Sequence, residues 1–181
     1  MLQRLPHSCY MPPSAKSGGF TLIELMVVVM ILAILAAFAA PAMQNMIVQN
    51  RLAGQTNELL GTIQFARGEA IKRNQSIRFC PVANAGDTAC DADAGNWAHW
   101  VVALNADDTV LRQGSMPTNL QLSSDLDNNT LIFAPTGLNN VTDGVADTIT
   151  LCSPTGNGDT TRTIKVRLAG GTTISQSPGC N

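Results

Sequence analysis

The chain of 181 residues carries a formal net charge of −2, which gives no general support for binding to nucleic acid or to anionic membranes. Only 4% of its residues are aromatic, so a folded core must rely on leucine, isoleucine, valine and alanine. The length allows one membrane helix and one domain of modest size.

Residues 1–19 form a short cationic leader. They contain Arg4 and Lys16 and no acidic residue, and such charge next to an apolar segment favours the cytoplasmic side of a membrane. Either Met1 or Met11 can be the start residue, and both give the same chain from Phe20 onward. We leave the leader out of the fold prediction; its removal lowers the net charge to −4 because two of the basic residues leave.

An apolar run of about 21 residues follows, from Phe20 to Ala40. A helix of roughly 20 apolar residues spans a bilayer. The run contains one charged residue, Glu24, and a carboxylate at the centre of a membrane helix costs about 2.5–3.5 kcal/mol on insertion scales. We therefore predict a transmembrane helix over 20–40 in which Glu24 needs a cationic partner.

The sequence GGFTLIEL at 18–25 resembles the processing site of type IV pilins and type II secretion pseudopilins. The resemblance implies that a prepilin peptidase cuts after Gly19 and that the new first residue, Phe20, is N-methylated. It also implies that Glu24 pairs with the terminal amine of a neighbouring subunit in a filament.

An ordinary secretory signal peptide is the alternative interpretation. Ala37-Phe38-Ala39 fits an A-x-A cleavage site that would release a soluble periplasmic binding domain beginning at Ala40. The apolar run is longer than the usual h-region of about 7–15 residues, and a glutamate is unexpected there.

A helical pattern continues beyond Pro41. Proline inside a helix removes a hydrogen bond and costs about 3 kcal/mol, so we expect a kink at Pro41. Apolar residues then recur at spacings of three, four or seven, which predicts an amphipathic helix over 41–74 that ends at Asn74. The positions are Val48, Leu52, Leu59, Ile63, Ala66 and Ala70.

Gly54, Gly61 and Gly68 stand seven residues apart on this helix. Each costs about 1 kcal/mol relative to alanine. Close packing of the helix on its own sheet is the favoured explanation, and contact with a neighbouring subunit's helix is the alternative.

After Asn74 the pattern changes to the alternation of β-strands. Ile77 and Phe79 alternate with polar residues, and Ile164, Val166 and Leu168 do so near the end of the chain. Such alternation is typical of an antiparallel sheet with one solvated face. Further strands are expected at 97–104, 109–113, 119–123, 130–134, 148–152 and 162–168.

Removal of the leader, with its Cys9, leaves four cysteines. An even number suits an oxidising compartment and allows three disulfide pairings. Proximity favours Cys80–Cys90 and Cys152–Cys180, which would stabilise the fold by roughly 3 and 3.5 kcal/mol through chain entropy. A metal site is a poor alternative because the mature chain has no C-x-x-C and one histidine, His99.

The segment ARGEAIKRNQSIRFC at 66–80, with β-patterned segments up to RTIKVRLAGG at 162–171, is similar to the GspH/FimT group of minor pseudopilins. The resemblance implies a structural subunit of the tip complex that primes filament assembly. Its partners would be other pseudopilins or pilins and an inner-membrane assembly platform, in type II secretion or in a type IV pilus.

No residue pattern indicates an enzyme or a cofactor. No serine or cysteine lies in a nucleophile motif, His99 suits a strand edge, and paired carboxylates occur in turns. Asp125-Leu126-Asp127 resembles the start of a calcium loop but lacks its glycine and terminal glutamate, so we expect a turn and no metal.

Arg162, Lys165 and Arg167 are candidates for a basic stripe near the C-terminus. Some FimT-type proteins bind DNA through a C-terminal Gly-Arg-x-Arg motif. This chain has Gly170-Gly171-Thr172-Thr173 at that point, without either arginine, which disfavours DNA binding. A DNA-binding minor pilin for DNA uptake stays an alternative function.

We therefore predict an α+β protein in which a long N-terminal helix packs on an antiparallel, β-rich head. The segments are a cleaved leader (1–19), a transmembrane helix (20–40), its amphipathic continuation (41–74) and a periplasmic head (75–181). The protein would be a single-pass subunit of the bacterial inner membrane that assembles into a filament.

Overall fold

A computed structural model describes residues 19–141, 147–154 and 160–180, without the side chains of residues 39–42. The leader residues Arg4, Cys9 and Lys16 lie outside the described part of the chain. The chain divides into two units, before and after the Ala40–Pro41 bond.

The helix α1 extends from Leu22 to Arg73. Its end is set by Asn74, which adopts a left-handed conformation with φ of 53°. The Asn74 N–H donates to the Ile71 carbonyl and the Gln75 N–H to the Ala70 carbonyl, at 3.3 and 3.2 Å. Asparagine tolerates this conformation, so it closes the helix as a C-terminal cap.

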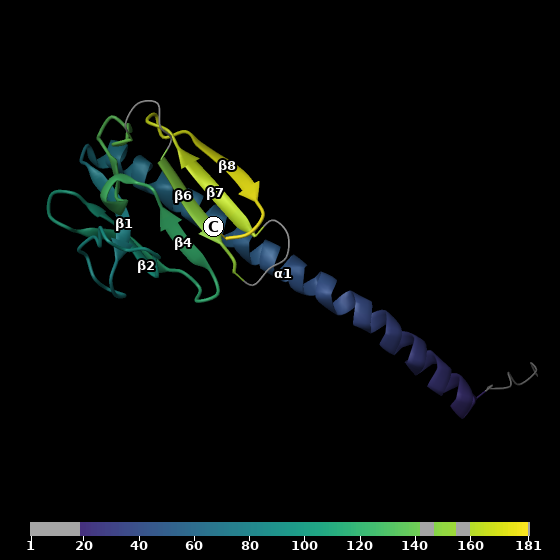
Figure 1. Cartoon of the computed structure of the whole chain (residues 1–181). Coiled ribbons are helices and arrows are strands. Elements are labelled where there is room, and N and C mark those ends of the chain that lie inside the picture. Colours follow the sequence, from purple (N-terminus) through teal and green to yellow (C-terminus); the bar gives the residue numbers. More distant parts are fainter. Residues whose placement is uncertain (1–18, 142–146, 155–159, 181) are drawn as a thin grey trace, which may run out of the picture. The chain divides into compact units, whose positions relative to one another are not determined.

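Eight strands form two antiparallel sheets of four strands each (Figure 1). Sheet A has the order β3-β2-β1-β5, and sheet B has the order β4-β6-β7-β8. The strands are β1 (Ile77–Val82), β2 (His99–Leu104), β3 (Val110–Ser115), β4 (Gln121–Ser124), β5 (Leu131–Phe133), β6 (Asp147–Cys152), β7 (Thr161–Val166) and β8 (Thr172–Ser177). A short 3-10 helix, η1, covers Asp127–Asn129 between β4 and β5.

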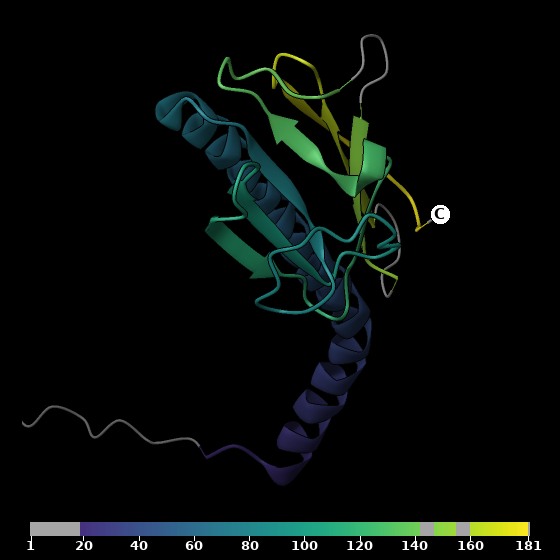
Figure 2. The ribbon, with the colours of Figure 1, turned by 90° about the vertical axis from the view of Figure 1, so that its left-hand side faces the viewer.

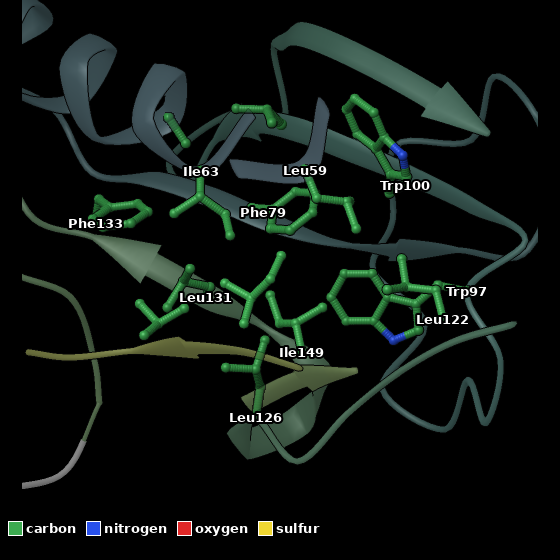
Figure 3. Close-up of a cluster of buried hydrophobic side chains, with 14 of the residues drawn as sticks. Leu59, Ile63, Phe79, Trp97, Trp100, Leu122, Leu126, Leu131, Phe133 and Ile149 are labelled. Carbon is green, nitrogen blue, oxygen red and sulfur yellow. The ribbon is translucent and has the colours of Figure 1, made fainter. Parts of the chain in front are cut away.

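The second half of α1 shares one hydrophobic core with both sheets. In Figure 2 the teal strand β1 of sheet A and the yellow strand β8 of sheet B lie on different sides of the head. In Figure 3, Leu59 and Ile63 of the helix point toward Phe79 of sheet A, and Ile149 of sheet B faces them. The helix contributes Leu52, Leu59, Ile63, Ala66 and Ala70 to the core, all fully buried.

Phe79 lies at the centre of an aromatic group within this core. Its ring meets Trp97 and Trp100 edge-on, with centroids 5.4 and 5.7 Å apart. Such edge-to-face pairs contribute about 0.5–1.5 kcal/mol beyond the area that they bury.

The outer face of sheet A has a small core of its own. Cys80 and Val82 of β1 pack there with Val101 and Ala103 of β2, and Cys90 covers them from the following loop. Consequently every residue of β1 is buried, because the helix covers one face of the strand and this loop covers the other.

The α+β prediction is confirmed, and most predicted strands are present at the expected positions. Four details were wrong. The strand predicted at 162–168 ends at Val166, so Leu168 lies in the following turn. The alternation at Ile77 and Phe79 predicted one solvated face, whereas β1 is buried on both faces.

The strand predicted at 97–104 begins at His99, because Trp97 lies in the preceding loop with its ring in the core. Strand β8 was missed because Ile174 is its only large apolar residue, so it shows no alternation.

A pair of glycine variants tests the packing. A Cβ on Gly114 would collide with the Trp100 ring, whereas a Cβ on Gly61 of α1 meets open space. We expect Gly114→Ala to destabilise the fold by about 1–3 kcal/mol and Gly61→Ala to stabilise it by up to about 1 kcal/mol. Thermal unfolding of the two full-length variants in detergent measures both effects, and destabilisation by Gly61→Ala would contradict the described environment.

Candidate functional site

The N-terminal turn of α1 brings together the residues of the predicted processing site. Thr21 caps the helix: its Oγ1 accepts the Glu24 N–H at 3.3 Å, and its carbonyl accepts the Leu25 N–H at 3.2 Å. This T-x-x-E arrangement is half of a capping box, and it places Glu24 in the first turn, where the helix dipole favours a negative charge.

The Gly19–Phe20 bond, where cleavage is predicted, is accessible. Gly19 and Phe20 precede the helix and are exposed, Phe20 to 84%. Glu24 is exposed as well, and no ion pair reaches it from any described residue.

The first half of α1 presents apolar side chains on all sides. From Leu22 to Phe38 its large hydrophobic residues are all at least 46% exposed, although burial of each would stabilise by about 1.5–3 kcal/mol. No single described segment has the length and composition of a membrane span, but Leu22–Phe38 and Met43–Arg73 do when taken together.

Pro41 lies at the boundary between the two units. The helix α1 does not end there, because it extends from Leu22 to Arg73. The side chains of residues 39–42 are not described, and the kink stays a prediction.

The favoured explanation for Gly54, Gly61 and Gly68 is wrong. All three are exposed, and a Cβ on each would meet nothing within 4 Å. The helix therefore packs on its own sheets through another face, which carries Leu59 and Ile63. Contact of the glycine strip with a neighbouring helix stays a prediction.

The four described cysteines form Cys80–Cys90 and Cys152–Cys180, each with Cα atoms 5.6 Å apart. This is the pairing that proximity in the sequence favours. The first disulfide closes the loop over the outer face of sheet A, and the second ties the C-terminus to the end of β6.

Arg67 joins α1 to two loops, one after β5 of sheet A and one after β7 of sheet B. The sequence did not reveal this role. Its Nε donates to the Gly137 carbonyl at 3.0 Å, and its side chain fills the space beside Gly170. Both glycines have positive φ angles, 78° and 73°, so glycine suits each position twice: in its backbone angle and in the room it leaves for Arg67.

The buried Arg78 has a charged partner in the turn after β2. It is 9% exposed, forms an ion pair with Asp108, and donates to the Thr88 carbonyl at 2.9 Å. A polar cavity of about 470 Å³ lies beside it. The contacts hold the turn after β2 and the disulfide loop against sheet A.

The segment Asp125–Asn129 forms a structural turn. The Asp125 carboxylate accepts the Thr148 N–H, and Asn129 donates to the carbonyls of Ala92 and Ala94 at 2.7 and 3.1 Å. Among the residues with described positions, no cluster of histidine, cysteine or acidic side chains suits a metal ion.

Carboxylates around this turn nevertheless interact. Burial raises the pKa of Asp147 above its usual 3.8, and repulsion from Asp125 and then Asp127 adds to the rise. The ionised form of Asp147 is therefore less favourable in the folded protein than in the unfolded chain.

His99 begins β2 beside a cavity of about 250 Å³. Its Nδ1 is buried and has no hydrogen-bond partner within the described ranges. Gln113 and Ser115 lie at the same cavity, but no carboxylate lines it. The described lining therefore contains no Ser-His-Asp arrangement.

The three basic residues of the C-terminal segment do not form one stripe. Arg162 pairs with Gln176 on the same side of sheet B as Ile164 and is partly buried, with Nε inside the protein. Lys165 alternates to the other face, and Arg167 follows β7 in the turn; both are exposed. Thr172 and Thr173, at the position of the absent arginines, begin β8.

Comparison with known families gives two matches. Residues 55–171 match the family described as type II transport protein GspH, and residues 14–40 match the prokaryotic N-terminal methylation motif. No curated protein sequence matches the chain significantly.

The fold is similar to that of the type IV minor pilin FimU of Pseudomonas aeruginosa. In one crystal form the TM-score is 0.52 at 18% identity, covering 74% of this chain and 99% of FimU. A second crystal form gives 0.49 at 22% identity, covering 72% and 90%. At this identity the first comparison shows a shared fold.

The raised pKa of Asp147 predicts a pH-dependent effect. Above the raised pKa, ionised Asp147 destabilises the folded state; the penalty disappears as pH falls below 3.8, where the carboxyl is protonated in both states. We therefore expect Asp147→Asn to raise the unfolding temperature at pH 7 and to leave it unchanged near pH 3. Equal stability of the variant and the wild type at pH 7 would contradict this account.

Proposed function

This chain belongs to the GspH family of type II transport proteins, and from that membership we propose that it is a minor pseudopilin of a type II secretion system. The family consists of structural, pilin-like proteins, so the role is that of a filament subunit and not of an enzyme. The observation that carries the proposal is the order of two matches along one chain: the N-terminal methylation motif comes first and the GspH region follows.

Processing would occur at the exposed Gly19–Phe20 bond, directly before the helix cap at Thr21. Hydrolysis by the prepilin peptidase frees the Phe20 amine, and methylation of that nitrogen preserves its positive charge. The new cation then lies next to the first turn of α1, which carries Glu24.

Glu24 would pair with the Phe20 amine of a neighbouring subunit. A carboxylate and an ammonium in an apolar environment attract each other strongly, and removal of one partner of such a pair costs about 3–5 kcal/mol. The apolar residues of 22–38 give that environment once the helices of several subunits surround Glu24. The pair would thus favour one register between neighbouring helices.

The same segment supports a location in the inner membrane. Residues 20–40 would first span the inner membrane, with the leader in the cytoplasm and the head in the periplasm. After cleavage the helix would leave the bilayer for a bundle of like helices, at an assembly platform in the membrane. Head-to-tail contacts suit a filament that is open at its ends.

In-cell crosslinking of the tagged full-length chain, with mass spectrometry of its neighbours, tests the proposal. Secretion pseudopilins and secretion-platform proteins are the expected partners. Pilus subunits would instead indicate a type IV pilus, the second use of the fold that it shares with FimU. Recovery of neither group would contradict a filament role.

The pairing of Glu24 predicts a specific defect. We expect Glu24→Gln to insert into the membrane normally, because a neutral side chain is less costly there. Incorporation into the filament should fall by about tenfold or more, since the amine of the neighbour loses its partner. The matched control is Glu58→Gln, an exposed residue of the same helix. Wild-type incorporation of the Glu24 variant, measured by crosslinking, would contradict the pairing.

A further inference from the structure

Strand edges expose main-chain donors and acceptors, and proteins usually protect them from pairing with other chains. The two sheets have four edges: β3 and β5 in sheet A, β4 and β8 in sheet B. Three of these edges carry a recognisable protection.

On β5, Asn140 covers the edge: its Oδ1 accepts the Ile132 N–H at 2.8 Å, and its N–H donates to the Ile132 carbonyl at 3.0 Å. On β4, residues of the preceding loop do the same for Leu122. The Leu122 N–H donates to Asn96 Oδ1 at 2.8 Å, and its carbonyl accepts the Trp97 N–H at 2.7 Å.

The edge of β3 is protected differently. The register of β2 and β3 shifts at Val102, which marks a bulge. Arg112 turns back over the rings of Phe65 and Trp100, at 5.8 and 6.0 Å from their centroids. Bulges and inward-pointing charges are two established ways to prevent pairing at an edge.

β8 has none of these features. Its six residues, TTISQS, include no charge and no proline, five are exposed, and Ile174 is 44% exposed. The strand is nevertheless held in place at both ends, by the turn at Gly170 beside Arg67 and by the Cys152–Cys180 disulfide. Figure 1 shows β8 in yellow at the border of sheet B.

The hydrogen-bond pattern identifies the free groups. The Arg167 N–H donates to the Gly171 carbonyl at 2.9 Å, and bonded and non-bonded pairs alternate along an antiparallel ladder. With the observed register, Thr173, Ser175 and Ser177 bond to β7. Thr172, Ile174 and Gln176 therefore direct their N–H and carbonyl groups to the open edge, and no described residue bonds to them there.

Charge indicates the kind of strand that fits. Lys165, which is the register partner of Thr173, and Arg167 are exposed beside the start of β8, and neither forms an ion pair within the described chain. A strand added to β8 would therefore be favoured by acidic side chains near this end.

A second copy of the chain fits less well. Antiparallel pairing of β8 with the β8 of another copy relates the two heads by a two-fold axis perpendicular to the sheet. The second half of α1 would then run in opposite directions in the two copies, whereas subunits anchored in one membrane share one direction.

We propose that the open edge of β8 binds an extended, acidic segment of a neighbouring, non-identical filament subunit by main-chain hydrogen bonds. The inference rests on the proposed function and adds to it a docking surface on the head. It corresponds to recognition by strand addition, in which the main chain provides affinity and flanking side chains provide specificity.

The test uses the full-length tagged chain in cells that contain the filament machinery. Gln176→Pro removes one outward N–H, whereas the matched control Gln176→Thr keeps it, and neither changes the charge. Because proline removes one main-chain hydrogen bond and also disturbs its neighbours, we expect Gln176→Pro to reduce the yield of crosslinked neighbouring subunits about tenfold. Gln176→Thr should retain the wild-type yield, and both should keep the two disulfides.

A photo-crosslinking residue at Gln176 tests the same edge without relying on the proline variant. Adducts should map to an extended acidic segment of a different filament subunit, and the same probe at Gln121 on the covered strand β4 should give few. Adducts between two copies of β8, or normal recovery of neighbours by Gln176→Pro, would overturn the inference alone. If the wild-type chain recovers no filament subunit, the proposed function fails and this inference fails with it.

Discussion

The architecture depends on the burial of one stripe of α1 between two sheets. Leu52, Leu59 and Ile63 are fully buried in a core that contains Phe79 of sheet A and Ile149 of sheet B. Separation of the helix from the head would expose to water the apolar side chains of both sheets that pack against it. The head is therefore built onto the helix, and Arg67 strengthens the attachment at two loops.

The first half of the same helix needs contacts from outside the described chain. Between Leu22 and Phe38 the apolar side chains have no cover from the described chain, so they need either lipid or the helices of other subunits. In the proposed account, cleavage after Gly19 allows the exchange of one environment for the other, because it creates the cation that Glu24 needs among helices. One continuous helix thus links assembly at its N-terminal end with a folded head at the other.

Patterns that follow from burial were predictable from the sequence. Spacing along 48–70 located the buried helix face, and alternation at Ile77 and Phe79 or at Ile164 and Val166 located central strands. Exposed elements leave no such signal. The edge strand β8 has one large apolar residue, and the open environment of Gly61 depends on which helix face meets the sheets. The Arg78–Asp108 ion pair joins residues from different strands and turns, so only the fold brings them together.

In the proposed function, processing after Gly19 converts a membrane-anchored precursor into a filament subunit. The most direct test is the intact mass and N-terminal sequence of the chain purified from membranes of cells that contain the prepilin peptidase. We expect a mature chain that begins at Phe20 and carries a methyl group on its terminal nitrogen. A chain that begins at Ala40, recovered in the soluble periplasmic fraction, would contradict it.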